Sequence, residues 1–306
     1  MKGKLQIALG IVVMGACMAR AEAGDDWIKD MVIVSGQFVH GGEPARQMFE
    51  NAKIGINLTV SAIASSLILG IGRIFVDASI GLESFGLVSF AISLTSFFLQ
   101  FISQISMVLF PMLRRFNEKD AITFYAKISN ILSFVLCLMY VVFIPLRIIL
   151  QRWLPQYTDS FSYLAILLPI CLFDGKMQML YNTYLKVFRK EKVLLMINML
   201  IFLLSAGLCA VAAFILRSIQ VIAVMMVIVI AIRSLLTNVY LSCVMGISNE
   251  KKLYWEVVIS LVFVLTNVFF NDWFVFLTNV VSVGIYYSVF RNDLKSLIHN
   301  IKVRMC

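Results

Sequence analysis

The chain has 306 residues, of which 61% are hydrophobic and only 14% charged, and its 26 Lys and Arg outnumber its 17 Asp and Glu. Soluble domains carry about 25% charged residues, so this composition excludes a soluble globular enzyme, a disordered chain and a disulfide scaffold. It is typical of a protein that crosses a membrane several times, in which an excess of Lys and Arg marks cytoplasmic loops rather than a nucleic-acid partner.

The N-terminal 50 residues contain one short apolar stretch, at 5–19. Lys2 and Lys4 precede it and Ala21-Glu22-Ala23 follows, which is the pattern of a signal peptide with its cleavage site. Cleavage there would put the next residues outside and invert every later helix. The charge distribution given below favours the alternative, a short helix that runs from outside to inside, followed by a cytoplasmic linker up to residue 50.

Eight apolar runs follow from residue 54 onward. A membrane-spanning helix needs about 20 apolar residues, and continuous runs without the alternation of a strand exclude a barrel. The sequence therefore predicts an all-α integral membrane protein with one short N-terminal apolar helix and about eight transmembrane helices. The runs are 54–72, 86–112, 121–146, 160–185, 193–216, 219–246, 253–270 and 273–290.

The connections between these runs predict the orientation. Seventeen Lys and Arg fall on one side of the membrane and four on the other, if the runs alternate in direction. Positive residues collect in cytoplasmic loops. We therefore expect a multi-pass protein of the cytoplasmic (inner) membrane, with a cytoplasmic C-terminus and short outer loops.

Two runs carry polar residues at helical spacing. In the second run the spacings are four, three, four and three residues, which places the polar side chains on one helical face, and the first run repeats the pattern at a spacing of four. Such a face either packs against another helix or lines a water-filled cavity, and the sequence leaves both alternatives open. The residues are Ser89, Ser93, Ser96, Gln100 and Ser103 in the second run and Asn57, Ser61 and Ser65 in the first.

Charged residues inside the runs are the strongest candidates for a site, because a charge in mid-membrane costs about 2.5–3.5 kcal/mol on insertion scales. The fourth run contains Asp174 and Lys176 below a predicted kink at Pro169, and the sixth contains Arg233. Counted from the outer ends, both sites lie roughly 21 Å deep at 1.5 Å per residue, so Asp174 can pair with Arg233. Lys176 is then left over. The cluster is either a structural ion pair or a cationic patch for an anionic substrate.

Arg73 and Asp77 lie at the outer edge of the first run, four residues apart, where one helical turn could pair them. A snorkelling Arg73 at the membrane interface is the alternative.

No arrangement of residues predicts an enzyme, a metal site or a bound cofactor. The two histidines, His40 and His299, lie outside the apolar runs, no two of the six cysteines share a CxxC spacing, and no glycine-rich phosphate loop is present. The outer loops are too short to hold a catalytic site. We therefore expect no enzymatic activity.

Residues 51–115 resemble the flippases of O-antigen, capsule and related polysaccharide pathways, which belong to the superfamily of the multidrug and toxin extruders. The segments that carry the resemblance are LILGIGR at 67–73, FG at 85–86, SFAISL at 89–94 and VLFPMLRR at 108–115. A further segment, FDGKMQMLYNTYLKVFRKEK at 173–192, is similar to the family's tenth helix and the loop after it.

The resemblance implies two bundles, of twelve to fourteen helices in all, that rock to move a polyprenyl-pyrophosphate-linked oligosaccharide to the outer leaflet. It implies that 51–248 is a six-helix bundle equivalent to the second half of such a transporter and that 249–306 adds two helices and a cytoplasmic tail. The first bundle would be a separate or missing part. The implied coupling ion is a proton or sodium, and polysaccharide polymerase machinery is a further expected partner.

The family's cationic cavity implies roles for the charged residues identified above. The candidate substrate-binding residues are Arg73, Asp174, Lys176, Arg233 and Gln100. Two other functions stay open, a multidrug extruder-like transporter and a non-transporting membrane subunit of a polysaccharide export complex. An extruder would prefer acidic cavity residues, whereas here buried cations outnumber buried acids and favour an anionic substrate.

Overall fold

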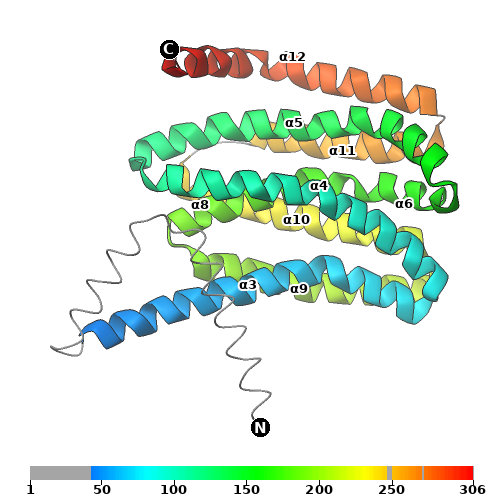
Figure 1. The fold of residues 1–306 in the computed structure, drawn as a ribbon, viewed down its shortest axis with the longest axis horizontal. Coiled ribbons are helices and arrows are strands. Elements are labelled where there is room, and N and C mark those ends of the chain that lie inside the picture. The colour runs from blue at the N-terminus through cyan, green and yellow to red at the C-terminus, as the bar shows by residue number, and fades with distance from the viewer. Residues whose placement is uncertain (1–42, 247–249, 271, 306) are drawn as a thin grey trace, which may run out of the picture.

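The computed structural model describes residues 43–246, 250–270 and 272–305, and these residues form helices and short turns without a strand (Figure 1). This agrees with the predicted all-α class. The expected short helix at 5–19 and most of the linker after it lie outside the described residues.

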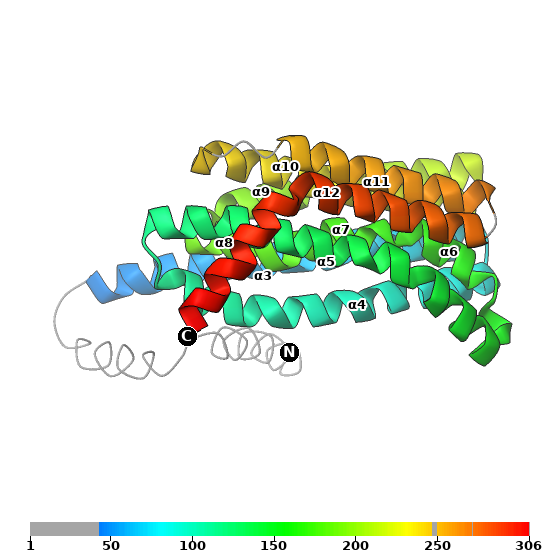
Figure 2. The same ribbon diagram turned by 90° about the horizontal axis from the view of Figure 1, so that it is seen from above.

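The described chain folds into a series of antiparallel helices whose connections are short (Figures 1 and 2). The elements are α3 (Glu43–Ser79), α4 (Leu82–Arg114), α5 (Glu118–Trp153), η1 (Pro155–Tyr157), α6 (Ser160–Leu167), α7 (Pro169–Lys176), η2 (Met177–Tyr181), α8 (Asn182–Val187), α9 (Glu191–Val211), η3 (Ala212–Leu216), α10 (Ile219–Met245), α11 (Glu250–Phe269) and α12 (Asp272–Met305).

Each of the eight apolar runs coincides with a helical segment. Within the described ranges, seven segments are long and apolar enough to cross a membrane by length and composition. The apolar part of α11, Leu253–Phe269, falls short of the length that the others reach. The structure therefore gives seven candidate spans and one shorter apolar helix where the sequence predicts eight spans.

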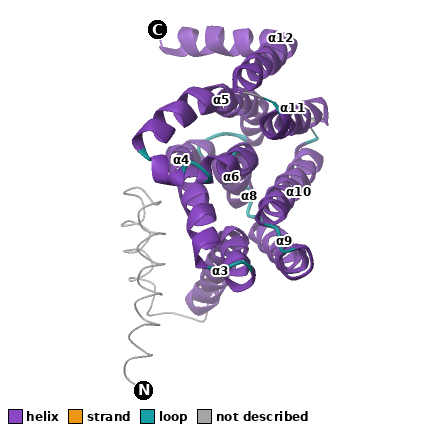
Figure 3. Cartoon of the chain, turned by 90° about the vertical axis from the view of Figure 1, so that its right-hand side faces the viewer, coloured by secondary structure: helices purple, strands orange, loops and turns teal. Residues whose placement is uncertain are grey.

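The segment from α6 to α8 is the centre of the bundle. Its apolar window is 89% buried, whereas the windows of the other six candidate spans are between 17% and 39% buried. Seen along the helices, α6 and α8 lie inside an arc formed by α4, α5, α11 and α10 (Figure 3). Side chains of this central segment are thus the most completely buried of the candidate spans.

The central segment is interrupted twice. α6 ends at Leu167 and α7 begins at Pro169, since proline has no N–H to donate to the preceding turn. The break predicted at Pro169 is therefore confirmed. A π-helical turn, η2, follows Lys176 and joins α7 to α8; such turns occur frequently at functional sites.

Gly175 lets the central segment approach its neighbours closely. A Cβ at this position would lie 3.0 Å from Cδ1 of Ile102 in α4 and 3.4 Å from Leu136 in α5. The absence of a side chain thus brings the backbone between Asp174 and Lys176 against two helices, which fixes where these two charges sit.

The antiparallel order puts the Lys- and Arg-rich connections, α4–α5 and α8–α9, at one end of the bundle, together with the start of α3 (Figure 1). The α3–α4, α5–α6 and α9–α10 connections lie at the opposite end. We call these the basic end and the opposite end. The cytoplasmic location of the basic end remains a prediction.

Candidate functional site

The predicted ion pair between Asp174 and Arg233 is present. A guanidinium N–H of Arg233 in α10 donates to Oδ1 of Asp174 in α7 at 3.1 Å, and both residues are buried. The equal depth estimated from the sequence thus placed the two residues correctly.

Arg233 is held by three helices besides its own. Its Nε donates to Oδ1 of Asn198 in α9 at 2.9 Å, and its second terminal nitrogen donates to Oγ of Ser65 in α3 at 2.9 Å. Asn198 in turn donates to Oγ of Ser61 at 2.6 Å. Ser61 and Ser65, two members of the polar stripe on the first run, therefore face the interior, and this stripe packs against other helices.

The second carboxylate oxygen of Asp174 also has a partner. Nε2 of Gln178, one turn along the central segment, donates to Oδ2 at 2.7 Å. Both oxygens of this buried carboxylate are thus hydrogen-bonded, which offsets part of the cost of removing the charge from water.

The expectation that Lys176 has no acidic partner is wrong. Its ammonium group donates to both carboxylate oxygens of Glu256 in α11, at 2.7 and 2.8 Å, and Oγ of Ser133 in α5 donates to Glu256 at 2.6 Å. Lys176 and Glu256 are both buried. Glu256 lies inside the seventh apolar run, and its position in that run was the signal for a buried acid.

Asp174 and Lys176 pair with different helices because of their spacing. Two residues correspond to about 200° around an α-helix, so the two side chains leave α7 on opposite sides. Asp174 reaches α10 and Lys176 reaches α11. The inference that buried cations outnumber buried acids in this cluster is therefore wrong, because two acids balance two bases.

This balanced network, which we call the central ion-pair cluster, consists of Asp174, Lys176, Arg233 and Glu256. Each charge is buried and bonded to protein groups. As placed here, the cluster joins α7 to α10 and α11 and presents no free charge to a ligand. A direct substrate contact by Asp174, Lys176 or Arg233 stays a prediction.

The polar stripe on the second run faces outward. Of its members, Ser93 and Gln100 are exposed on α4, while Ser89, Ser96 and Ser103 are half-buried; Gln104, one turn after Gln100 and outside the predicted stripe, is also exposed. The opposite face of α4, which includes Val88, Ile92 and Leu99, is buried in the bundle. The two stripes left undecided by the sequence thus differ: the one on α3 is internal and the one on α4 is on the surface.

Arg73 is half-buried on α3 and does not pair with Asp77 in the described structure, so the predicted one-turn ion pair is absent. Its Nε is buried without a hydrogen-bond partner among the described residues. Arg73 is thus a cation whose guanidinium keeps donors available, unlike Lys176 and Arg233.

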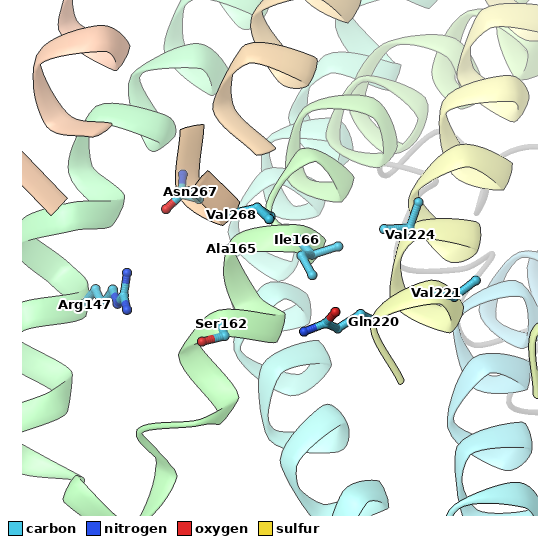
Figure 4. Close-up of a pocket in the computed structure, with 9 residues that line it drawn as sticks. All are labelled: Arg147, Ser162, Ala165, Ile166, Gln220, Val221, Val224, Asn267 and Val268. Carbon is cyan, nitrogen blue, oxygen red and sulfur yellow. The ribbon is translucent and has the colours of Figure 1, made fainter. Parts of the chain in front are cut away.

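A cavity of about 450 Å³ opens at the opposite end of the bundle between α5, α6, α10 and α11 (Figure 4). We call it the Arg147 cavity. It is lined by Arg147, Ser162, Ala165, Ile166, Gln220, Val221, Val224, Asn267 and Val268. Its size lies in the range of small-molecule sites, about 300–1,000 Å³.

No set of three His, Cys, Asp or Glu side chains in the described part of the chain is arranged to hold a metal ion. No family model, no curated protein and no solved structure matches the chain. The functional argument therefore depends on the polar face of α4, Arg73, the central ion-pair cluster and the Arg147 cavity.

Proposed function

We propose that this chain is one bundle of a membrane transporter that flips a lipid-linked oligosaccharide, and that it works together with a second helical bundle. The proposed cargo is an oligosaccharide on a polyprenyl pyrophosphate, which moves from the cytoplasmic to the outer leaflet. The observation that most directly supports this proposal is the exposed polar face of α4.

Gln100 and Gln104 place two amides among the exposed Phe97, Phe101 and Ile105 of α4, and these amides are poorly suited to contact with lipid tails. Gln100 lies close to the midpoint of the 33-residue α4, and Gln104 follows one turn later on the same face. Neither amide has a side-chain hydrogen bond to the described part of the protein, and an unsatisfied amide in an apolar medium costs roughly 2–7 kcal/mol. Water in a cavity, or a polar partner, would remove this cost.

Ser96 and Ser103 on the same face depend less on a polar neighbour than the two glutamines do, because their hydroxyls already donate hydrogen bonds within α4. Oγ of Ser96 donates to the carbonyl of Ile92, and Oγ of Ser103 donates to the carbonyl of Gln100. They remain acceptors toward a ligand. An uncharged row of amides and hydroxyls can exchange hydrogen bonds with sugar hydroxyls while holding none of them strongly, which suits a path along which a substrate moves.

A second bundle against α4 would enclose this path, because alternating access needs two bodies that move about a shared site. Arg73 on the neighbouring α3 would supply a charge for the pyrophosphate, since a guanidinium matches phosphate oxygens with paired donors. Because the charges of the central ion-pair cluster balance, the cluster favours neither an anionic nor a cationic cargo. The uncharged α4 face and the resemblance at 51–115 support the oligosaccharide.

The test is a Gln100→Leu/Gln104→Leu variant in a strain in which the chain is co-expressed with its second bundle. Surface polysaccharide should fall strongly while the amount of the chain in the membrane stays normal, because the substituted positions are exposed and do not contribute to the core.

Ser288→Leu on α12 is the matched control. Ser288 is also an exposed polar residue, and its hydroxyl donates to the carbonyl of Gly284 within its own helix. Ser288→Leu should leave both the surface polysaccharide and the amount of the chain in the membrane unchanged. Normal surface polysaccharide in the Gln100→Leu/Gln104→Leu strain would contradict the proposed path along α4.

A further inference from the structure

The Arg147 cavity lies away from both the α4 face and the central ion-pair cluster, and it has a polar and an apolar side. Val221, Val224 and Val268, together with Ile166, form the apolar side. Arg147, Ser162, Gln220 and Asn267 supply the polar groups, and in Figure 4 they project from four helices toward one space.

The charge on the polar side is already neutralised. NH1 of Arg147 donates to Oδ1 of Asp272 at the start of α12, at 2.9 Å. An anionic ligand would have to compete with this carboxylate for the guanidinium. A neutral ligand can use the remaining donors without displacing Asp272.

Two buried polar atoms in the cavity wall are unsatisfied within the described structure, Nε of Arg147 and Oδ1 of Asn267. One is a donor and the other an acceptor. The amide nitrogen of Asn267 is engaged by the carbonyl of Phe263 at 2.8 Å, which fixes the direction of the free oxygen. A group that satisfies both atoms must accept one hydrogen bond and donate another, as a hydroxyl does.

Ser162 and Gln220 are exposed at the mouth of the cavity and can each donate and accept. Several such groups around one space suit a ligand with several hydroxyls. The apolar side adds contact for a hydrocarbon chain. We infer that the Arg147 cavity binds a neutral sugar headgroup carried on an apolar chain, with the sugar on Arg147 and Asn267 and the chain along Val221 and Val224.

This site goes beyond the proposed function, because its ligand has no pyrophosphate between the sugar and the apolar chain and is therefore a neutral glycolipid distinct from the proposed cargo. It does not need the α4 path, a second bundle or transport for its test. Binding without transport would refute only the flippase, and transport without binding would refute only this site.

The experiment measures protection of one cysteine in the full chain reconstituted in lipid nanodiscs. The six native cysteines are replaced and Val268→Cys is introduced at the exposed rim of the cavity. Octyl glucoside, below its micelle concentration, should slow labelling of this cysteine by a thiol reagent by about tenfold when the site is near 90% occupied. Octyl phosphate, with the same tail, and methyl glucoside, with the same sugar, should each slow it far less.

Two variants test the location. Val224→Trp should fill the cavity and abolish protection, and Asn267→Leu should weaken octyl glucoside binding by about fivefold because one hydrogen bond of about 1 kcal/mol is lost. Leu261→Trp, which introduces the same side chain at an exposed site on α11, is the control and should keep full protection.

Equal protection by octyl phosphate would overturn the neutral headgroup, and equal protection by methyl glucoside would overturn the apolar chain. Protection that survives both Val224→Trp and Asn267→Leu would overturn the site itself.

Discussion

Lys176 and Glu256 form a buried ion pair in which one ammonium group donates to both oxygens of one carboxylate, at 2.7 and 2.8 Å. This pair ties α11, the first of the two C-terminal helices, to the central segment of the bundle. The two C-terminal helices are thus joined to the bundle through its interior as well as through their packing on α5. The sequence treated them as an addition to a complete six-helix bundle.

Removing one partner of this pair should destabilise the protein. Glu256→Gln or Lys176→Met leaves the other charge buried without its partner, a change that costs about 3–5 kcal/mol in buried pairs of soluble proteins. The double variant removes both charges and should recover most of the loss. The measurement is the melting temperature of the solubilised chain, followed by size-exclusion chromatography after heating.

Asp120→Asn, at an exposed acid of α5, is the control for loss of a carboxylate and should leave the melting temperature unchanged. If the double variant melts as low as the worse of the two single variants, the ion pair does not explain the loss. If Lys176 belonged to a cationic patch for an anionic substrate, Lys176→Ala would lower transport at normal abundance; the pair with Glu256 predicts lower abundance instead.

Arg233 should not be replaceable by lysine. The guanidinium reaches Asp174, Asn198 and Ser65 with three different nitrogens, and a single ammonium group cannot reproduce this fork. Arg233→Lys should therefore lower membrane abundance nearly as far as Arg233→Met. Quantitative immunoblotting of membranes measures this, and abundance of Arg233→Lys close to the unsubstituted chain would show that only the charge is needed.

The helices and one ion pair were predictable because they depend on local and regular features. Continuous apolar runs determine where membrane helices form, and equal distance from the end at which two helices start determines which of their charges meet. The lack of an N–H in Pro169 predicted the break in the central segment. These features require no knowledge of which helices are neighbours.

Two features depend on which helices are neighbours: the identity of the partner of Lys176, and whether each polar stripe points into the bundle or away from it. Nothing in the spacing of Ser61 and Ser65 distinguishes an internal stripe from the external one around Gln100. The difference arises because Asn198 and Arg233 come to lie against α3. Likewise, the position of Glu256 inside an apolar run signals a buried acid, but its pairing with Lys176 follows only when α11 is placed beside α7.

The orientation can be tested by cysteine labelling. In a variant without the six native cysteines, Thr158→Cys lies in the exposed α5–α6 connection and Lys190→Cys in the exposed α8–α9 connection at the other end. An impermeant maleimide added to intact cells that are permeable only at the outer membrane should label Thr158→Cys alone. Lys190→Cys should react only after the inner membrane is opened, because basic connections stay in the cytoplasm.

The reverse labelling pattern would show that every helix has the opposite orientation in the membrane. It would also restore the interpretation of residues 5–19 as a cleaved signal peptide.

The last prediction concerns the need for a second bundle. An exposed row of amides and hydroxyls on α4, with Gln100 near the middle of the helix, would face lipid if this chain worked by itself. We therefore expect that the chain alone does not restore surface polysaccharide in a strain that lacks its flippase, and that co-expression with a six-helix partner bundle does. The measurement is surface polysaccharide at matched amounts of the chain in the membrane.

A disulfide between two copies carrying Gln104→Cys tests the alternative, in which a second copy of this chain covers α4. We expect no such crosslink when the partner bundle is present. Full restoration by this chain alone, together with an efficient Gln104→Cys crosslink, would show that two copies enclose the path and that no separate bundle is required.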